Sequence, residues 1–268
     1  MIVKSLFTYT LKSSRGTSMA SVPIERTGFR HDRSVVVVDN QGNIATARER
    51  PELVKLESSI SGNRLWLEGT TVDTASFELP GPAKGTSIKL FRNRVEGIPF
   101  EKRADDWISQ YLDGEFRLFY IGDLFNGVLP KRGGKDAEVK TFTDSSPIHL
   151  INSRTLEYLS SRTPASIGSR NFRPNIVIDG NEPFEEDLWG TVNIGQCSFR
   201  MQEKTNRCIF TTIDPDTSDK NKDMEPLATL ARTRSVMGER PIFGIGLVPL
   251  ALGEIKVGDA VKVVQERN

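Results

Sequence analysis

The chain has 268 residues, long enough for one large or two medium domains. Its 36 basic and 35 acidic residues nearly balance, which argues against a general nucleic-acid binder, because such modules carry a clear basic excess. Two cysteines are too few for a disulfide framework, and with two histidines a zinc site made of protein ligands alone is not expected. No apolar run approaches the roughly 18 residues of a membrane-spanning helix, and the N-terminus lacks a signal-peptide layout, so we expect a cytoplasmic protein.

Short segments of β-branched and apolar residues dominate the first half of the chain. A run of valines predicts a strand over residues 35–38, and an Asn-Gln-Gly-Asn turn sends residues 44–48 back as a hairpin. Further strands are expected over residues 2–7, 54–60, 65–68, 75–79, 87–91, 94–100 and 116–121. One helix is predicted over residues 104–112, where apolar side chains follow helical spacing.

A basic loop rich in glycine and proline, over residues 122–139, indicates a boundary or a lid, and we place the division between two lobes near residue 120. Beyond it, helices are expected from a cap at Ser153 to residue 159 and over residues 225–232. An acidic turn is expected over residues 182–187, and strands are expected over residues 148–151, 176–178, 194–199, 242–244 and 253–264. Because strands dominate and helices are few, the predicted fold class is mainly β (α+β), a barrel-like architecture with inserted helices.

Cys208 is the candidate reactive group. It follows Arg207 and opens a stretch, residues 208–212, that has the composition of a short β-strand. A neighbouring cation favours the thiolate, the form that attacks electrophiles and binds soft metals. A buried core cysteine is the plain alternative, and Cys197, inside the strand predicted over residues 194–199, is interpreted in that way.

Several separate basic segments could converge on one anion. Lys12 and Ser13 lie in a polar loop that ends in glycine, Arg33 precedes the valine strand, and Arg48 ends the first hairpin. Basic residues outnumber acidic ones up to Arg48, so a small anionic ligand would be attracted to this end of the chain. The sequence contains no glycine-rich nucleotide fingerprint and no zinc-ligand spacing. The residues alone therefore predict one activated cysteine and a set of cationic segments.

Ten short motifs occur in the order found in MOSC-domain proteins. They begin at Leu11 (L-K-S-S-R-G), Asp32 (D-R), Thr46 (T-A-R), Asp144 (D-S-S-P), Asn171 (N-F-R-P-N), Glu186 (E-D-L-W), Arg207 (R-C-I-F-T-T), Asp214 (D-P-D-T), Glu225 (E-P-L) and Ile255 (I-K-V-G-D). The chain resembles this family from Ile2 to about Val264, and within the family it is most similar to the amidoxime-reducing components and their bacterial relatives. The resemblance implies an N-terminal MOSC-associated β-barrel domain over residues 1–120 and a MOSC domain over residues 121–268, with the first strand and the Lys12 loop joining the site.

The resemblance also implies a molybdenum cofactor (molybdopterin), in which Cys208 supplies the protein's sulfur ligand to the metal and is catalytic. The candidates for contacting the pterin phosphate and ring edge are Lys12, Ser13, Arg33, Arg48 and Arg173. Asn175 would pair with the amide edge of the pterin, and Asp144 would orient an arginine or relay protons as a second catalytic residue. Arg207 and Asn206 flank the ligand cysteine, and Asn206 stands where the family usually has serine.

Family members of this type reduce N-hydroxylated compounds, so the chain is expected to be an oxidoreductase that acts on small N-hydroxylated substrates. It lacks the iron–sulfur cysteines of some bacterial relatives, and a separate reductase or ferredoxin is therefore the expected electron donor. No nucleic acid or membrane partner is expected. Two alternatives stay open: a carrier of the cofactor or of sulfur, as a persulfide on Cys208, and a non-catalytic binding β-barrel. Pyridoxal phosphate is associated with related cofactor sulfurases, but no lysine context here demands a Schiff base.

Overall fold

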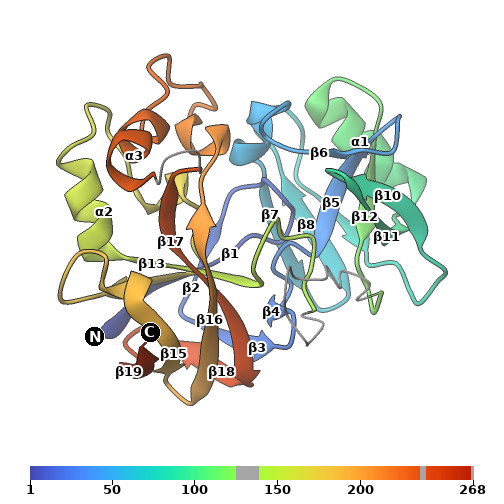
Figure 1. Cartoon of the computed structure of the whole chain (residues 1–268). Helices are drawn as coiled ribbons and strands as arrows, with labels where there is room; N and C mark the ends of the chain where they lie inside the picture. The colour runs from blue at the N-terminus through green and yellow to red at the C-terminus, as the bar shows by residue number, and fades with distance from the viewer. Residues whose placement is uncertain (125–138, 236–239, 267–268) are drawn as a thin grey trace. The chain divides into compact units, whose positions relative to one another are not determined.

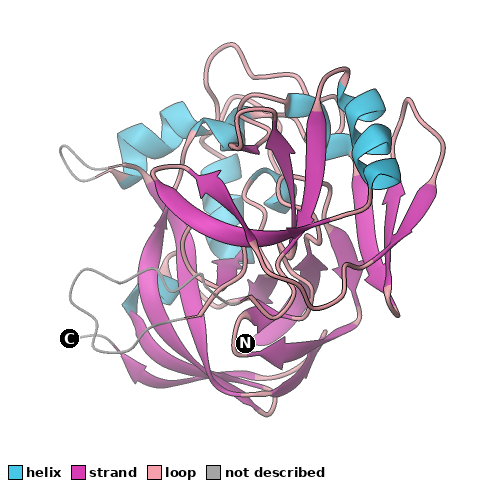
Figure 2. Cartoon of the chain, turned by 90° about the vertical axis from the view of Figure 1, so that its right-hand side faces the viewer, coloured by secondary structure: helices cyan, strands magenta, loops and turns pink. Residues whose placement is uncertain are grey.

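The computed structural model describes residues 1–124, 139–235 and 240–266, and strands are its main element (Figure 2). The predicted mainly-β class is confirmed. The chain forms two compact units whose segments alternate along the sequence. Unit 1 comprises Met1–Thr8, Ser18–Arg30 and Asp144–Asn268, and unit 2 comprises Tyr9–Thr17 and His31–Thr143. The compact units exchange segments and so do not follow a single cut in the chain. The predicted domain division near residue 120 stays a prediction.

Unit 1 is built on an eight-stranded sheet in the order β19-β15-β16-β17-β13-β14-β1-β2 (Figure 1). Its strands are β1 (Ile2–Thr8), β2 (Thr17–Met19), β13 (Ile148–Asn152), β14 (Ile176–Asp179), β15 (Trp189–Ile194), β16 (Cys197–Asn206), β17 (Ile242–Ala251) and β19 (Val261–Glu266). The sheet curls back on itself, because the Val3 amide donates to the Asp259 carbonyl at 2.9 Å and Ile2 bridges to Ala260. This closure makes the sheet a barrel.

The interior of this barrel is filled by buried apolar side chains from its strands. On β1, Val3 and Leu6 are fully buried, and on β16 the buried set includes Cys197 and Phe199. Burial raises the pKa of the Cys197 thiol, and the nearby Asp259 carboxylate raises it further. Cys197 is therefore a core residue, as the sequence predicted.

Smaller elements complete unit 1. A three-stranded sheet joins β3 (Ser21–Glu25), β4 (Gly28–Phe29) and β18 (Gly253–Lys256) in the order β18-β3-β4, and the helices are α2 (Ser153–Ser160) and α3 (Leu227–Arg234). The N-cap of helix α2 is Asn152 and not the predicted Ser153, which is the first residue of the helix. The side-chain oxygen of Asn152 accepts from the Arg154 amide at 2.9 Å. The amide side chain of asparagine caps as well as a hydroxyl does, so the sequence located the helix but misassigned its cap.

Unit 2 contains a five-stranded sheet in the order β10-β11-β12-β5-β6 and a separate three-stranded sheet β7-β8-β9. The strands are β5 (Val35–Asp39), β6 (Ile44–Ala45), β7 (Glu57–Ser61), β8 (Arg64–Glu68), β9 (Ala75–Glu78), β10 (Thr86–Leu90), β11 (Asn93–Pro99) and β12 (Phe116–Tyr120). The five-stranded sheet also closes, because Asn43 bridges to Lys89 and connects β6 with β10. The helix α1 (Lys102–Leu112) lies where the sequence predicted one.

Two strand predictions were wrong in detail. Residues 54–60 begin as the 3-10 helix η1 (Pro51–Lys55), because proline is well suited to the first helical position and the adjacent Leu53 and Val54 are both buried, a pattern that does not alternate. Residues 194–199 are not one strand but the junction of β15 and β16. Gly195, with φ +56°, makes the turn between them.

Of the basic loop predicted over residues 122–139, only residues 122–124 and 139 lie inside the described part of the chain. Its interpretation as a lid therefore falls outside the described residues. Among the helices of the described residues, none is long and apolar enough to span a bilayer.

Candidate functional site

Cys208 lies at the N-cap of the 3-10 helix η4 (Ile209–Thr212), two residues after β16 ends. The predicted β-type run over residues 208–212 is thus wrong. Threonine hydroxyls account for the difference: Thr211 donates to the Cys208 carbonyl at 3.0 Å from both its amide and its hydroxyl, and the Thr212 hydroxyl donates to the Ile209 carbonyl. Cys208 is half-buried and forms no disulfide, whereas Cys197 is inside the core. Of the two cysteines, Cys208 alone is placed to meet a ligand.

The guanidinium of Arg207 holds three parts of unit 1 together beside this cysteine. Its Nε donates to the Phe243 carbonyl and its Nη1 to the Phe172 carbonyl, each at 3.1 Å. Its Nη2 lies 2.6 Å from Nε2 of His149. Because a guanidinium only donates, we assign Nε2 of His149 as the acceptor, which puts the proton of a neutral imidazole on Nδ1. Arg207 therefore fixes the backbone on which Cys208 sits.

Gly244 allows β17 to approach this cluster. It has φ +72°, and an added Cβ would lie 2.6 Å from Nε2 of His149 and 2.5 Å from the Leu150 carbonyl oxygen. Both features exclude a side chain, because left-handed backbone is strained for other residues and the carbonyl belongs to the neighbouring strand.

We expect the substitution Gly244→Ala to lower the free energy of unfolding by about 3 kcal/mol, since strain and a main-chain clash add. Gly258→Ala is the matched control in the same unit, with φ +91° but open space around its added Cβ, and it should cost only about 1 kcal/mol. Denaturant unfolding of the two variants measures the difference. Equal losses would show that the approach to His149 does not require glycine.

Arg173 and Asn175 lie close to the same cluster. Arg173 has left-handed backbone, φ +53°, and its guanidinium lies 5.2 Å from the centre of the Phe210 ring on η4. Asn175 is buried: its Oδ1 accepts from the His149 amide at 3.0 Å and its Nδ2 donates to the Phe7 carbonyl at 3.2 Å. Its amide thus joins β13 to β1, and the predicted contact with a pterin stays a prediction.

The two remaining unit 1 candidates are at the surface. Asn206 is exposed at the end of β16, and Asp144 is exposed at the start of the last segment of unit 1. Their roles stay predictions. Three residues before Cys208, the Thr205 hydroxyl is buried and is one of several buried polar atoms with no hydrogen-bond partner among the described residues. Buried hydroxyls are normally paired, so an unpaired one is able to form a hydrogen bond with a bound group.

The other four candidates belong to unit 2. Lys12 and Ser13 were expected in a polar loop that presents donors; both are buried, and Ser13 has φ +72°. The Lys12 ammonium donates to the Phe142 carbonyl at 2.7 Å. Two cations lie near the Phe91 ring. The Cζ of Arg48 is 5.0 Å and the Nζ of Lys12 is 5.9 Å from the ring centre. The structure therefore brings Lys12 and Arg48 together.

Arg33 is held by two neighbours in unit 2. It forms an ion pair with the buried Asp32, and its Cζ lies 4.2 Å from the centre of the Tyr9 ring. Asp32 also accepts from the Tyr9 amide at 2.9 Å. Arg33 therefore has a structural role through its ion pair with Asp32. A contact with a ligand would come in addition to this ion pair.

Sequence reasoning missed two residues of these clusters. His149 carried a signal, because it is the one polar residue in the apolar run 148–151. Phe91 carried none, since an aromatic residue at the end of a predicted strand is ordinary. Contacts between residues far apart in the chain, such as Lys12 and Phe91, leave no local pattern.

The donor set fits a cofactor that brings its own metal ligands. In the described residues no group of three or more histidine, cysteine and acidic side chains is arranged to hold a metal ion. A metal at Cys208 would therefore take a single soft sulfur from the protein, with its other ligands from the cofactor. Cationic side chains and the Thr205 hydroxyl suit the polar and anionic parts of such a group.

Comparisons with known proteins agree with this description. The model of the MOSC N-terminal beta barrel domain matches residues 1–115, and that of the MOSC domain matches residues 137–262. Mitochondrial amidoxime reducing component 2 of Rattus norvegicus is 30% identical, over 97% of this chain and 82% of the relative. The chain belongs to the MOSC-domain family. Mitochondrial amidoxime-reducing component 1 of Homo sapiens is also 30% identical to this MOSC-domain protein, with the same two coverages. A crystal structure of the YUAD protein from Bacillus subtilis aligns with 97% of this chain and 93% of that chain, at 12% identity and a TM-score of 0.47.

Proposed function

We propose that this MOSC-domain protein binds a molybdenum cofactor through Cys208 and reduces N-hydroxylated compounds. The observation that carries the proposal is the placement of Cys208, a half-buried thiol outside any disulfide on a backbone fixed by η4 and by Arg207. The relatives that are named amidoxime-reducing components support the substrate class.

Each group of residues has a distinct part in this proposal. Cys208 provides the sulfur ligand, and Arg207 positions it through its bonds to the carbonyls of Phe172 and Phe243. Lys12 and Arg48 are the proposed sources of positive charge for the phosphate of the cofactor, and Arg173 is a further candidate. When bound, the cofactor supplies a redox centre able to take up the oxygen of an N–O bond.

The overall reaction fixes what else is needed. Conversion of an amidoxime to an amidine and water consumes two electrons and two protons. We propose that the electrons come from a separate reductase or ferredoxin. Asp144 is the proposed proton relay, because its exposed carboxylate can exchange protons with solvent.

Turnover tests this proposal. Protein from a host that makes the molybdenum cofactor should convert benzamidoxime to benzamidine with reduced methyl viologen as the electron source, and protein from a host that cannot make the cofactor should not. Chromatography measures the product. A sample with stoichiometric molybdenum and pterin but no turnover on amidoximes or hydroxylamines would reject the enzyme. Release of thiocyanate from Cys208 by cyanide would instead identify a sulfur carrier.

A further inference from the structure

Phe91 has an unusual backbone for its size. It begins the two-residue turn between β10 and β11, and of the two turn residues it is the one with positive φ, +56°. A positive φ at the first turn position alone is the pattern of a type II′ turn, where glycine is normally found. A bulky residue in left-handed backbone is strained, and such strain persists at positions that serve a function.

The Phe91 side chain is also exposed, with 57% of its surface accessible, so core packing does not account for it. Its ring nevertheless has two cations near its centre, Lys12 at 5.9 Å and Arg48 at 5.0 Å. The negative face of an aromatic ring attracts each cation, and this attraction offsets the repulsion between them.

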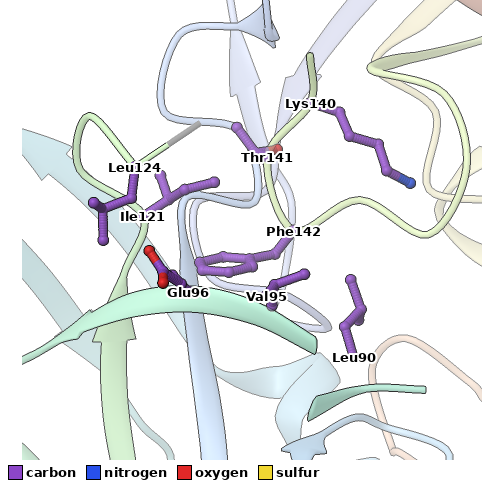
Figure 3. A pocket seen from close by; sticks show the side chains of 8 residues that line it. All are labelled: Leu90, Val95, Glu96, Ile121, Leu124, Lys140, Thr141 and Phe142. Atoms are coloured by element: carbon purple, nitrogen blue, oxygen red, sulfur yellow. The ribbon is translucent and has the colours of Figure 1, made fainter. Parts of the chain in front are cut away.

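The turn that carries Phe91 is flanked by buried apolar residues. Leu90 and Val95, on either side of the turn, line a small apolar pocket with Phe142. The Phe142 side chain points toward Ile121 and Val95, while the Lys140 side chain extends away from them (Figure 3). The carbonyl of the same Phe142 accepts from Lys12. The pocket thus anchors both the turn that carries Phe91 and one of the two cations.

We propose that Phe91 is a positioning residue, which holds Lys12 and Arg48 side by side as one binding site for a phosphate group. The identity of that phosphate, as part of the cofactor, rests on the proposed function. Two cations close together would repel each other without a ligand, and the ring keeps them near each other before the anion arrives. Such preorganisation lowers the cost of binding.

The test uses inorganic phosphate and the full chain without cofactor, with chloride at equal ionic strength as the reference. Phosphate affinity is measured by calorimetry or by the phosphate-induced rise of the unfolding temperature. Phe91→Leu keeps an apolar side chain but removes the ring, and it should weaken phosphate binding about fivefold. Phe91→Tyr keeps the ring and should bind within about twofold of the wild type. Restoration by tyrosine is a result that a merely structural role would not give.

A double variant separates the contribution of the ring from that of hydrophobic contact. In Arg48→Gln protein, one of the two cations is gone, so adding Phe91→Leu should weaken phosphate binding by only about twofold. If Phe91→Leu does not fold, Phe91→Asn replaces it, because asparagine accepts left-handed backbone.

Three results would overturn the inference: no phosphate binding by the wild type, unchanged binding in Phe91→Leu, or equal loss in Phe91→Tyr. Its failure is distinguishable from that of the proposed function. Wild-type protein that contains molybdenum and turns over amidoximes, but binds phosphate independently of Phe91, would reject only the inference. Phosphate binding through Phe91 without molybdenum or turnover would reject only the proposed function.

Discussion

Cys208→Ala protein from a cofactor-competent host is expected to lose its molybdenum, with metal content at least about tenfold below that of the wild type. The reason is that Cys208 is the cysteine outside the core, and the described residues hold no histidine, cysteine and acidic cluster that could retain a metal without it. Elemental analysis paired with released pterin measures the effect. Amidoxime turnover should fall at least as far.

Cys197→Ala is the matched control for this prediction. Cys197 is 1% exposed inside the barrel, so its replacement should lower stability through a small cavity but leave molybdenum per folded molecule unchanged. Metal loss in both variants would indicate that the cofactor responds to general destabilisation. Unchanged molybdenum in Cys208→Ala protein would remove Cys208 as the ligand.

Glu186→Gln is expected to make the protein more stable at pH 8 and to remove a pH dependence. Burial raises the pKa of Glu186 from 4.5 to about 7, although hydrogen bonds from Thr155 and Asn152 oppose the rise. Between pH 4.5 and about 7, the Glu186 carboxyl therefore keeps its proton in the native state, whereas in the unfolded state it has already released the proton. Stability from this group is fully present below about pH 4.5 and is lost as the pH rises to about 7, a total of about 3 kcal/mol.

Glutamine has the same shape, carries no charge and keeps a carbonyl oxygen that can accept from Thr155 and Asn152. The stability difference between Glu186→Gln and the wild type should thus be small at about pH 4.5 and grow to about 3 kcal/mol at about pH 8, measured by denaturant unfolding at each pH. The same change at the neighbouring Glu185, which is only half-buried, controls for adding an amide to η3 (Glu185–Leu188). A difference that does not vary with pH would show that Glu186 is ionised in the native state.

Much of the fold could be predicted from the sequence because local patterns carry it. The valine run of β5, the helical spacing of α1 and the turn residues between hairpins each reflect the conformation of a few neighbouring residues. The errors arose where one residue or a side-chain bond decides the outcome. Gly195 turns the chain inside an apolar run, and the Thr211 and Thr212 hydroxyls convert a β-type composition into η4.

The candidate site was predictable to a smaller degree. Cys208 was distinguished from Cys197 by the neighbouring Arg207 and by the ordered motifs, since Cys197 lies inside an apolar strand-like run. Several contacts join residues separated by up to 168 positions in the chain. They are the hydrogen bonds of Arg207 to carbonyls, those of Asn175 to β1 and β13, and the contacts of the Phe91 ring with two cations. Such long-range contacts depend on the completed fold and leave no trace in local composition.

The alternation of segments between the two units determines the order in which the protein can be made. Strand β1 leaves the ribosome first, but its antiparallel partner is β14, where Ile2 pairs with Asp179. Strand β3 waits even longer, because its partner β18 begins at Gly253. Unit 2 is complete by Thr143, so it can fold while the opening strands of unit 1 still lack their neighbours. A cut at residue 120 would separate β14 and β18 from their partners β1 and β3. We expect the C-terminal fragment, residues 121–268, to aggregate when expressed alone, because the edges of β14 and β18 would be exposed.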